Sequence, residues 1–344
     1  EKEEAKDTLV NSKVQSVDMP TSHISDAINT SITERIDTIS SALNSSPTSI
    51  AVSNTPTVSG INTGDDQQMM KGLWISGLYG QSTKKGHKNP YKGKMSGGSV
   101  GFDLSPTDTS LVGIAYSNVS SRFDYKNTGN KINANTHSVS IYTQQEMDNL
   151  FLRGIFSYMR SRINTNIHKG VAGNTAIAKS SFHNNAVSGE VIAGYKINNN
   201  LGFVIMPNIG VRLSHFQDGA HKENGAGVLN LDIKNASSQK LTGIAGIKLA
   251  ATRILDNGMF ITPTAHLSAE KYIHSKKAKT QAKFQWMDNY FDIKPQDKPA
   301  AMGYNIGTGL AVKRDNLALS ASYNCHVENK YTNHQGALKL KVLF

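Results

Sequence analysis

Strict alternation of apolar and polar residues is the feature that most constrains the fold of this chain. From about Lys71 to Phe344 the hydrophobic period is two, in runs far longer than the five or six residues usual for strands of soluble proteins. In the run 203–214 the odd positions are apolar, whereas the even positions include Asn208 and Arg212. One face of such a strand suits lipid and the other suits water, which is the pattern of a transmembrane β-barrel.

About twelve runs of this kind follow one another, and short turn sequences alternate with long polar connections between them. The predicted strands are 72–81, 92–104, 109–123, 132–145, 149–160, 179–197, 201–216, 239–255, 259–273, 300–313, 317–327 and 332–344. The predicted long connections are 82–91, 124–131, 161–178, 217–238 and 274–299. Only the last hairpin is short on the side where the connections are otherwise long.

This sorting of connections predicts a closed barrel and its orientation. All short turns fall at one end, as in outer-membrane barrels with periplasmic turns and extracellular loops. An even number of strands lets the first and last strands pair antiparallel, which removes both sheet edges. We therefore predict an all-β fold, a twelve-stranded antiparallel outer-membrane β-barrel over 71–344, with Phe344 at the periplasmic rim. A soluble β-sandwich, the alternative, has no reason to sort its connections in this way.

Composition excludes several other classes of protein. Hydrophobic residues make up 38% of the 344 residues, the mean hydropathy is −0.38, and nowhere do eighteen apolar residues follow one another, so we predict no membrane-spanning helix. The formal net charge is +11 and the sequence pI is about 9.5. The charges are nevertheless scattered, with no basic helix or interleaved aromatic residues, so we expect no nucleic-acid partner.

The first 70 residues are rich in Ser, Thr, Asn, Asp and Glu and nearly free of aromatic residues. Within them apolar residues recur at steps of three or four, which predicts one amphipathic helix over about 22–45. The apolar stripe consists of Ile24, Ile28, Ile32, Ile36, Ile39 and Leu43, and the predicted pore helix also includes the charged Arg35. A coiled-coil or docking helix fits the pattern equally well. Because the chain starts at Glu1 with no initiator Met or apolar leader, we expect it to be the C-terminal part of a longer precursor.

Charged residues on the polar faces of the predicted strands are candidates for the pore lining. On the lipid side a Lys or Arg at mid-depth would cost about 2 to 4 kcal/mol, whereas an inward charge stays hydrated or pairs across the pore. The predicted lining residues are Arg153, Glu190, Arg212, Lys248, Lys313, Lys339 and Lys341. A generic polar lining and a specific contact with the helix are both compatible with this set.

Candidate catalytic chemistry is weak. Residues 97–101, with Ser99 at the centre, match the letters G-x-S-x-G of a hydrolase elbow, but that motif needs a strand-to-helix turn and here it lies inside an alternating strand. The eleven histidines are scattered, and the one cysteine, Cys325, has no second cysteine to pair with. We therefore predict that the chain is not an enzyme and that it uses no cofactor and no metal.

Taken in order, these segments resemble the translocator (β) domain of monomeric autotransporters, the type V secretion proteins. The resemblance covers 22–344 and rests on the helix, the opening strand GLWISGLYG at 72–80, the segments GGSVGFD at 97–103 and VGIAY at 112–116, and the terminal Phe344. It implies a twelve-stranded barrel with an N-terminal α-helix in the pore. It also implies assembly by the outer-membrane barrel-insertion machinery, which reads the C-terminal strand and its final aromatic residue. Abundant Lys, Asn and Ile further suggest a surface cell antigen.

The resemblance also implies a domain organisation. Residues 1–21 would be the tail of an upstream passenger, 22–70 a linker with the pore helix, and 71–344 the translocator. About 24 helical residues at 1.5 Å each span roughly 36 Å, enough to cross a hydrocarbon core of about 30 Å. One branch of the family cleaves itself at an Asn-Asn pair in the helix. Here Asn29 precedes Thr30 and Asn44 precedes Ser45, so we expect release only by an external protease.

The leading functional hypothesis is an integral outer-membrane translocator that exports an upstream passenger to the cell surface and anchors it there. Its expected partners are outer-membrane lipid, the barrel-insertion machinery and its own passenger, and we expect a monomer. The first alternative is a self-contained outer-membrane porin or adhesin acting through its extracellular loops. The second is a barrel enzyme such as an outer-membrane protease or lipase, which would depend on Ser99.

Overall fold

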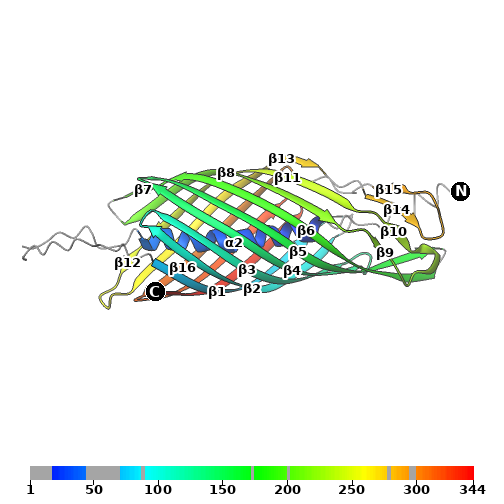
Figure 1. Cartoon of the computed structure of the whole chain (residues 1–344), viewed down its shortest axis with the longest axis horizontal. Helices are drawn as coiled ribbons and strands as arrows, with labels where there is room; N and C mark the ends of the chain where they lie inside the picture. The colour runs from blue at the N-terminus through cyan, green and yellow to red at the C-terminus, as the bar shows by residue number, and fades with distance from the viewer. Residues whose placement is uncertain are drawn as a thin grey trace, which may run out of the picture.

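The chain forms a closed antiparallel β-barrel around a long helix (Figure 1). The computed structural model describes residues 18–43, 70–86, 90–171, 174–199, 202–276, 280–293 and 300–344. The twelve long strands are β1 (Met70–Lys84), β2 (Tyr91–Thr107), β3 (Ser110–Tyr125), β4 (Lys131–Met147), β5 (Leu150–Val171), β6 (Asn174–Tyr195), β8 (Phe203–Asp218), β11 (Ala236–Ala251), β13 (Phe260–Lys276), β16 (Met302–Arg314), β17 (Leu317–Glu328) and β18 (Tyr331–Leu343). The two-residue strands β7 (Ile197–Asn198) and β12 (Arg253–Ile254) belong to turns.

The first and last strands close the barrel. β1 pairs antiparallel with β18 from Gly72 opposite Leu343 to Lys84 opposite Tyr331. Two main-chain hydrogen bonds of 3.0 Å between Lys71 and Phe344 extend this pairing to the last residue. Each long strand therefore has a partner on both sides, and the predicted twelve-stranded barrel is confirmed.

The predicted strand bounds agree with the observed ones to within about four residues, except at one hairpin. The expected long connection 161–178 is wrong, because β5 and β6 continue as a paired ladder up to Val171 opposite Asn174. Beyond Arg160 the buried face carries Ile163 and Ile167 while the outward positions are polar. In this extension the apolar side chains face inward and the polar side chains face outward, the reverse of the lipid-facing part. The extension could therefore not be predicted from apolar outward faces.

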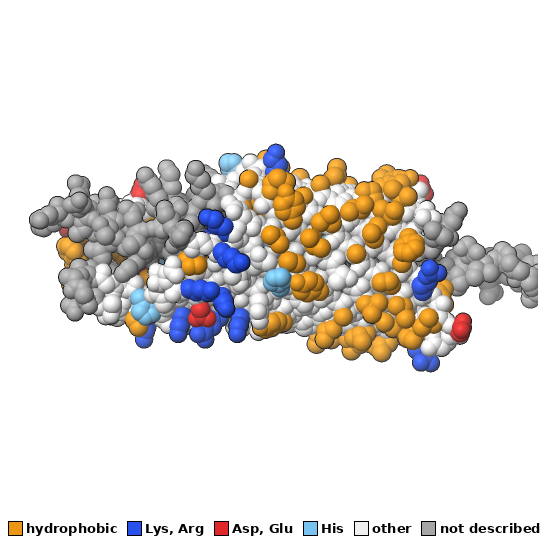
Figure 2. All heavy atoms as spheres, turned by 180° about the vertical axis from the view of Figure 1, so that it is seen from behind, with side chains coloured by type: hydrophobic (Ala, Val, Ile, Leu, Met, Phe, Trp, Pro, Cys, Tyr) orange, Lys and Arg blue, Asp and Glu red, His pale blue; other side chains and the backbone are white. Residues whose placement is uncertain are grey.

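A wide band of the outer surface of the barrel is apolar. Ile75, Ile209 and Leu338 face outward with 59%, 68% and 65% of their surface exposed, and many similar side chains join them in the band seen in Figure 2. Soluble monomers rarely expose apolar surface on this scale, whereas a barrel turns such a band toward lipid.

The two ends of the barrel differ. At one end the strands join through tight turns, with positive φ angles at Asp148 and Asp315 (both 52°) and Gly258 (76°). Phe344 lies at this end on the outer surface, with its ring centroid 6.5 Å from that of Phe102. At the other end the hairpins are long. This sorting of connections matches periplasmic turns and extracellular loops.

A second sheet, which was not predicted from the sequence, occupies the long-hairpin end. It comprises β9 (His221–Lys222), β10 (Leu231–Ile233), β14 (Thr280–Phe284) and β15 (Phe291–Ile293), and a 3-10 helix η1 (Gly227–Leu229) precedes β10. Its own apolar cluster contains Leu231, Ile233, Ala282, Phe284 and Ile293. The predicted connections 217–238 and 274–299 therefore hold short strands, which are too brief to show a hydrophobic period.

The helix α2 (Asp18–Leu43) lies along the barrel lumen, with its first residues toward the long-hairpin end (Figure 1). It begins four residues before the predicted start, and Pro20 lies in its first turn, where a missing N–H is tolerated. The described residues contain no helix that is long and apolar enough to cross a bilayer. The predicted helix in the pore is confirmed. Most of the predicted passenger tail (1–21) and the linker after the helix (44–69) lie outside the described residues.

Candidate functional site

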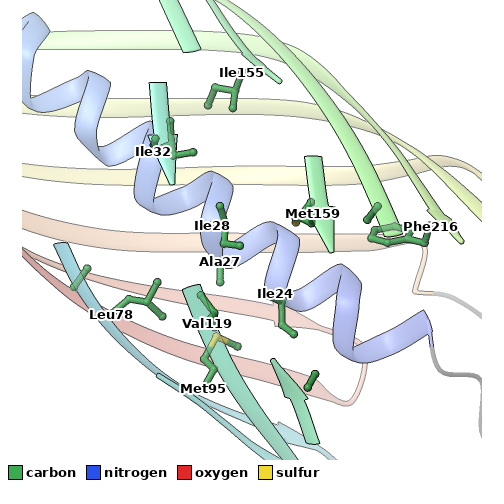
Figure 3. Packing of buried hydrophobic residues seen from close by; sticks show 14 of the residues in the cluster. Ile24, Ala27, Ile28, Ile32, Leu78, Met95, Val119, Ile155, Met159 and Phe216 are labelled. Carbon is green, nitrogen blue, oxygen red and sulfur yellow. The ribbon is translucent and has the colours of Figure 1, made fainter. Parts of the chain in front are cut away.

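The apolar stripe of α2 packs against one side of the barrel wall. Ile24, Ile28, Ile32 and Ile36 recur every four residues and are at most 1% exposed. Their buried cluster includes the wall residues Leu78, Met95, Val119, Ile155, Met159 and Phe216 (Figure 3). Burying one such side chain contributes about 1.5 to 3 kcal/mol. This side of the helix is therefore packed as part of a protein core.

Three further residues of the predicted pore helix are described only by their backbone. Arg35, Ile39 and Leu43 belong to α2, but their side chains lie outside the described part of the chain. Their contribution to the pore helix stays a prediction.

A buried charge cluster, the Arg212 cluster, ties the polar face of α2 to the opposite wall. Arg212 of β8 donates hydrogen bonds from Nε to Glu190 (2.6 Å) and from Nη1 to Asp26 of α2 (3.0 Å) and Glu270 of β13 (3.3 Å). Lys240 Nζ lies 3.9 Å from the second oxygen of Asp26. One guanidinium can serve several carboxylates because it has five donors in a fixed plane. The predicted residues Glu190 and Arg212 thus meet a helix residue that sequence reasoning did not select.

The polar network continues from this cluster toward the last strands. Asn305 donates to Glu270 (3.1 Å) and lies 2.8 Å from His326 Nδ1. His326 Nε2 in turn lies 2.9 Å from Glu328, which also accepts a hydrogen bond from Tyr272. Pairing of β13, β16 and β17 brings these groups together, so their grouping is not visible in the order of residues.

Strand β18 holds the main chain of α2. Gln335 donates to the carbonyl oxygen of Ala27 (3.2 Å), and Lys339 Nζ donates to that of Ser31 (3.0 Å). At the start of the same strand the ring of Tyr331 stacks on His23 at a centroid distance of 4.1 Å. These contacts are spaced four residues apart on both partners, so one side of the helix follows one face of β18.

Small hydroxyl residues line the wall where α2 passes. Cross-strand pairing joins Ser76, Ser99, Ser117 and Ser138 on β1 to β4, and then Ser140, Ser157, Ser188 and Ser214 on β4 to β8. All eight members of this serine ring are buried. Asn29 of α2 reaches the ring, donating to Ser188 (3.4 Å) and accepting from Ser157 (3.3 Å). The ring was not among the predicted lining residues, because its members come together only through the strand register.

The remaining predicted lining residues have described partners on the wall. Arg153 donates twice to Gln144 (3.2 and 3.1 Å), and Lys341 donates to Asp103 (3.3 Å). Lys248 lines an internal cavity, and Lys313 Nζ lies 5.8 Å from the centre of the Phe260 ring. The structure therefore places Arg212, Glu190 and Lys339 around α2, and Arg153 and Lys248 line a cavity that α2 also borders.

The lumen is not filled evenly. A cavity of about 110 Å³ lies beside the polar face of α2, lined by Thr30 and Thr33 of the helix and by Arg153, Glu190 and Lys248 of the wall. It has room for several water molecules. The helix is thus packed tightly on its isoleucine side and lies next to a small polar space on the other.

The hydrolase-like motif at residues 97–101 is part of strand β2. Ser99 lies in the middle of β2, is buried, and donates a hydrogen bond to Ser117 (2.8 Å) as a member of the serine ring. The strand continues beyond it to Thr107, so the strand-to-helix turn that the hydrolase elbow requires is not formed there.

Comparison with known proteins agrees with this geometry. The Autotransporter beta-domain family profile matches residues 73–324. The chain is 31% identical over 294 residues to the surface cell antigen sca2 of Rickettsia conorii and 32% identical over 307 residues to sca1 of the same species. These alignments cover 83% and 86% of the chain but only 16% of each relative. The chain thus spans less than a fifth of the length of these relatives.

Solved structures of autotransporter barrels have the same fold as this chain. The translocator domain of NalP from Neisseria meningitidis superposes with a TM-score of 0.62 at 16% identity, covering 80% of this chain and 89% of that one. The β domain of the Bordetella autotransporter BrkA gives 0.59 at 14% identity, covering 80% and 99%. The family match over most of the barrel, with a helix-filled lumen of twelve strands, shows that this chain belongs to the autotransporter β-domain family and is an integral outer-membrane protein.

Proposed function

We propose that this chain is the translocator of a larger surface protein, in which the barrel exports the segment preceding α2 to the cell surface and α2 then anchors it. One observation carries the proposal: α2 lies inside the lumen with its first residues toward the long-hairpin end. A chain that continues upstream from that end emerges on the extracellular side. The barrel would thus be both the route of export and the final anchor.

Further parts of the proposal concern partners. The closure of β1 on β18 satisfies both edge strands within one chain, which favours a monomer. Phe344 at the turn end is available as the aromatic terminus that the barrel-insertion machinery would recognise. If the passenger is released, an external protease would cut on the N-terminal side of α2, because no Asn-Asn pair lies within that helix. The polar lining would serve as a binding surface for α2 rather than as a catalytic site.

Surface display of a fused passenger tests the proposal. A reporter domain is placed before residue 1, and its accessibility to protease on intact cells is measured. Replacing residues 22–45 by a Gly/Ser linker of equal length should abolish stable display, because the packed stripe and the Asp26 contact are lost. The control replaces residues 1–17, upstream of α2, by a Gly/Ser linker of equal length and should display normally. Unchanged display without the helix would defeat the proposal.

A second candidate function is adhesion through the second sheet. Trp286 and Val228 are 66% and 71% exposed at the long-hairpin end, and the Trp286 indole donates to the Val228 carbonyl oxygen (2.8 Å). Exposed aromatic side chains often anchor protein contacts. If adhesion is the function, cells that display the barrel without a passenger will attach to host cells, and Trp286→Ala will weaken attachment. Equal attachment by the wild type and by Trp286→Ala would reject this role for Trp286.

A further inference from the structure

Basic side chains gather on the outward faces of β2 to β6, just beyond the apolar band. They are Lys92, Lys94, Arg122, Lys131, Arg160, Arg162 and Lys179, and all are exposed. We name this set the basic band. On the face shown in Figure 2, Lys and Arg side chains likewise lie between the apolar band and the hairpin end. As far as the structure describes these strands, one carboxylate, that of Asp124, shares the outward surface at this height, and it is paired with Arg122 (3.0 Å).

Three members of the basic band lie at a common height. Arg122 is twelve residues from the turn end of β3, Arg162 is twelve from that of β5, and Lys94 is thirteen from that of β2. A strand tilted by about 40° rises ~2.5 Å per residue along the membrane normal, which places these cations about 30 Å above the turns. The apolar band of an outer-membrane barrel is about 25 Å tall. The cations therefore lie at the level of lipid headgroups.

The boundary beneath the basic band has the side chains of a membrane interface. Tyr116 and Tyr158 are exposed, and strand pairing places both beside Val139. Tyrosine is enriched at headgroup level, where its hydroxyl is hydrated and its ring remains in the apolar layer. Arg160 follows Tyr158 at the next outward position of β5. The step from aromatic to cationic residues thus takes one strand repeat.

Pairing of neighbouring strands makes the band continuous. Lys94 lies opposite Arg122 in the β2–β3 ladder, Arg160 lies opposite His137, and Arg162 lies opposite His183. Neighbouring strands are about 4.8 Å apart, so the cations on β2 and β3 lie side by side and those on β5 lie two strands farther along the wall. A guanidinium matches the geometry of a phosphate, and a lysine adds a point charge.

From this placement we propose that the basic band is a binding site for the phosphate groups of multiply phosphorylated glycolipids in the outer leaflet. The inference rests on the proposed orientation, with the long-hairpin end outside the cell. Bound headgroups would fix the height of the barrel in the membrane and shield the repulsion among its cations. The site uses none of the residues that contact α2, so it is separate from the lumen.

Binding to the full-length chain in nonionic detergent tests the site. The probe is a bisphosphorylated lipid A, compared with the same lipid after removal of both phosphates, and bound lipid is quantified by native mass spectrometry. The variant Lys94→Gln/Arg122→Gln/Arg162→Gln should bind the bisphosphorylated form about tenfold or more weakly than the wild type. The charge-preserving variant Lys94→Arg/Arg122→Lys/Arg162→Lys should stay within about threefold. The resistance of each variant to SDS without heating confirms that the barrel is folded.

A control variant with the same loss of charge distinguishes binding at the basic band from general attraction between a cationic protein and an anionic lipid. Lys222→Gln/Lys234→Gln/Lys283→Gln removes three cations from the second sheet and should bind like the wild type. Equal binding of the dephosphorylated lipid, equal weakening in both triple variants, or saturation by inorganic phosphate at the same concentration would overturn the proposal. Because this assay needs no export, its failure is distinct from failure of the display experiment.

Discussion

At the scale of single residues, Arg212 connects the helix to the wall. It is buried, and it bonds to carboxylates on β6, β13 and α2. Its inward position could be predicted from the alternation of β8. Its partner Asp26 could not, because choosing between charges on α2 requires the rotation and depth of the helix in the lumen.

Replacing Arg212 by Met leaves Glu190, Glu270 and Asp26 without their shared partner in a buried setting. Removing one partner of a buried ion pair costs about 3 to 5 kcal/mol, so we expect a loss of that order in the free energy of unfolding, measured by urea titration in lipid vesicles. Arg212→Lys should recover part of the loss, because it restores the charge but not the planar fork. Arg253→Gln, at an exposed turn position, is the control. Equal stability of Arg212→Met and wild type would show that the cluster does not hold the helix.

The serine ring makes a second prediction at this scale. Ser188 is buried against Asn29, whereas Ser120 is an exposed outward position near the band boundary. Ser188→Leu should overfill the lumen at a cost of about 1 to 3 kcal/mol and loosen α2, raising the conductance of single barrels in a planar bilayer. Ser120→Leu should leave conductance unchanged. Identical conductance traces for the two variants would contradict the role of the ring in seating the helix.

At the scale of elements, the sequence predicted the strands of the membrane band and the helix, because long periods of two and of 3.6 residues are strong signals. It did not predict the extension of β5 and β6, where Ile163 and Ile167 turn the apolar face inward above the membrane. It also did not predict the second sheet, whose strands of two to five residues form only when distant hairpins meet. Local pattern is insufficient where pairing partners come from far along the chain.

The second sheet is expected to be sensitive to pH through His221. This residue of β9 stacks on Phe182 at a centroid distance of 3.9 Å, and burial lowers its pKa below the ordinary value of about 6.5. The ordered sheet favours neutral His221, so its stability is complete above about pH 6.5 and falls as the pH drops below that value. Hydrogen exchange of β9 and β10 amides, corrected for intrinsic pH effects, should lose protection near pH 5.

A phenylalanine at this position supplies the control. His221→Phe keeps a ring against Phe182 but cannot take up a proton, so protection in this variant should vary less between pH 7.5 and pH 5. If wild type and variant show the same profile, another group governs the second sheet.

At the scale of the whole molecule, the chain sorts its residues among three environments. Apolar side chains face lipid, small and charged side chains face α2, and a second sheet stands over the long-hairpin end. The number of strands and the direction of the barrel followed from the sequence because loop lengths sort by side. The central claim is that the helix remains in the lumen after export.

Crosslinking in living cells measures that claim directly. The variant Asn29→Cys/Ser157→Cys, in a Cys325→Ser background, places two thiols where the side chains of α2 and β5 now share a hydrogen bond of 3.3 Å. The control Asn29→Cys/Ser120→Cys places the second thiol on the outer face of the barrel. On chains whose fused passenger is already displayed, we predict that a short thiol crosslinker joins residues 29 and 157 and does not join 29 and 120. Displayed chains in which 29 and 157 fail to crosslink would contradict a helix held in the lumen.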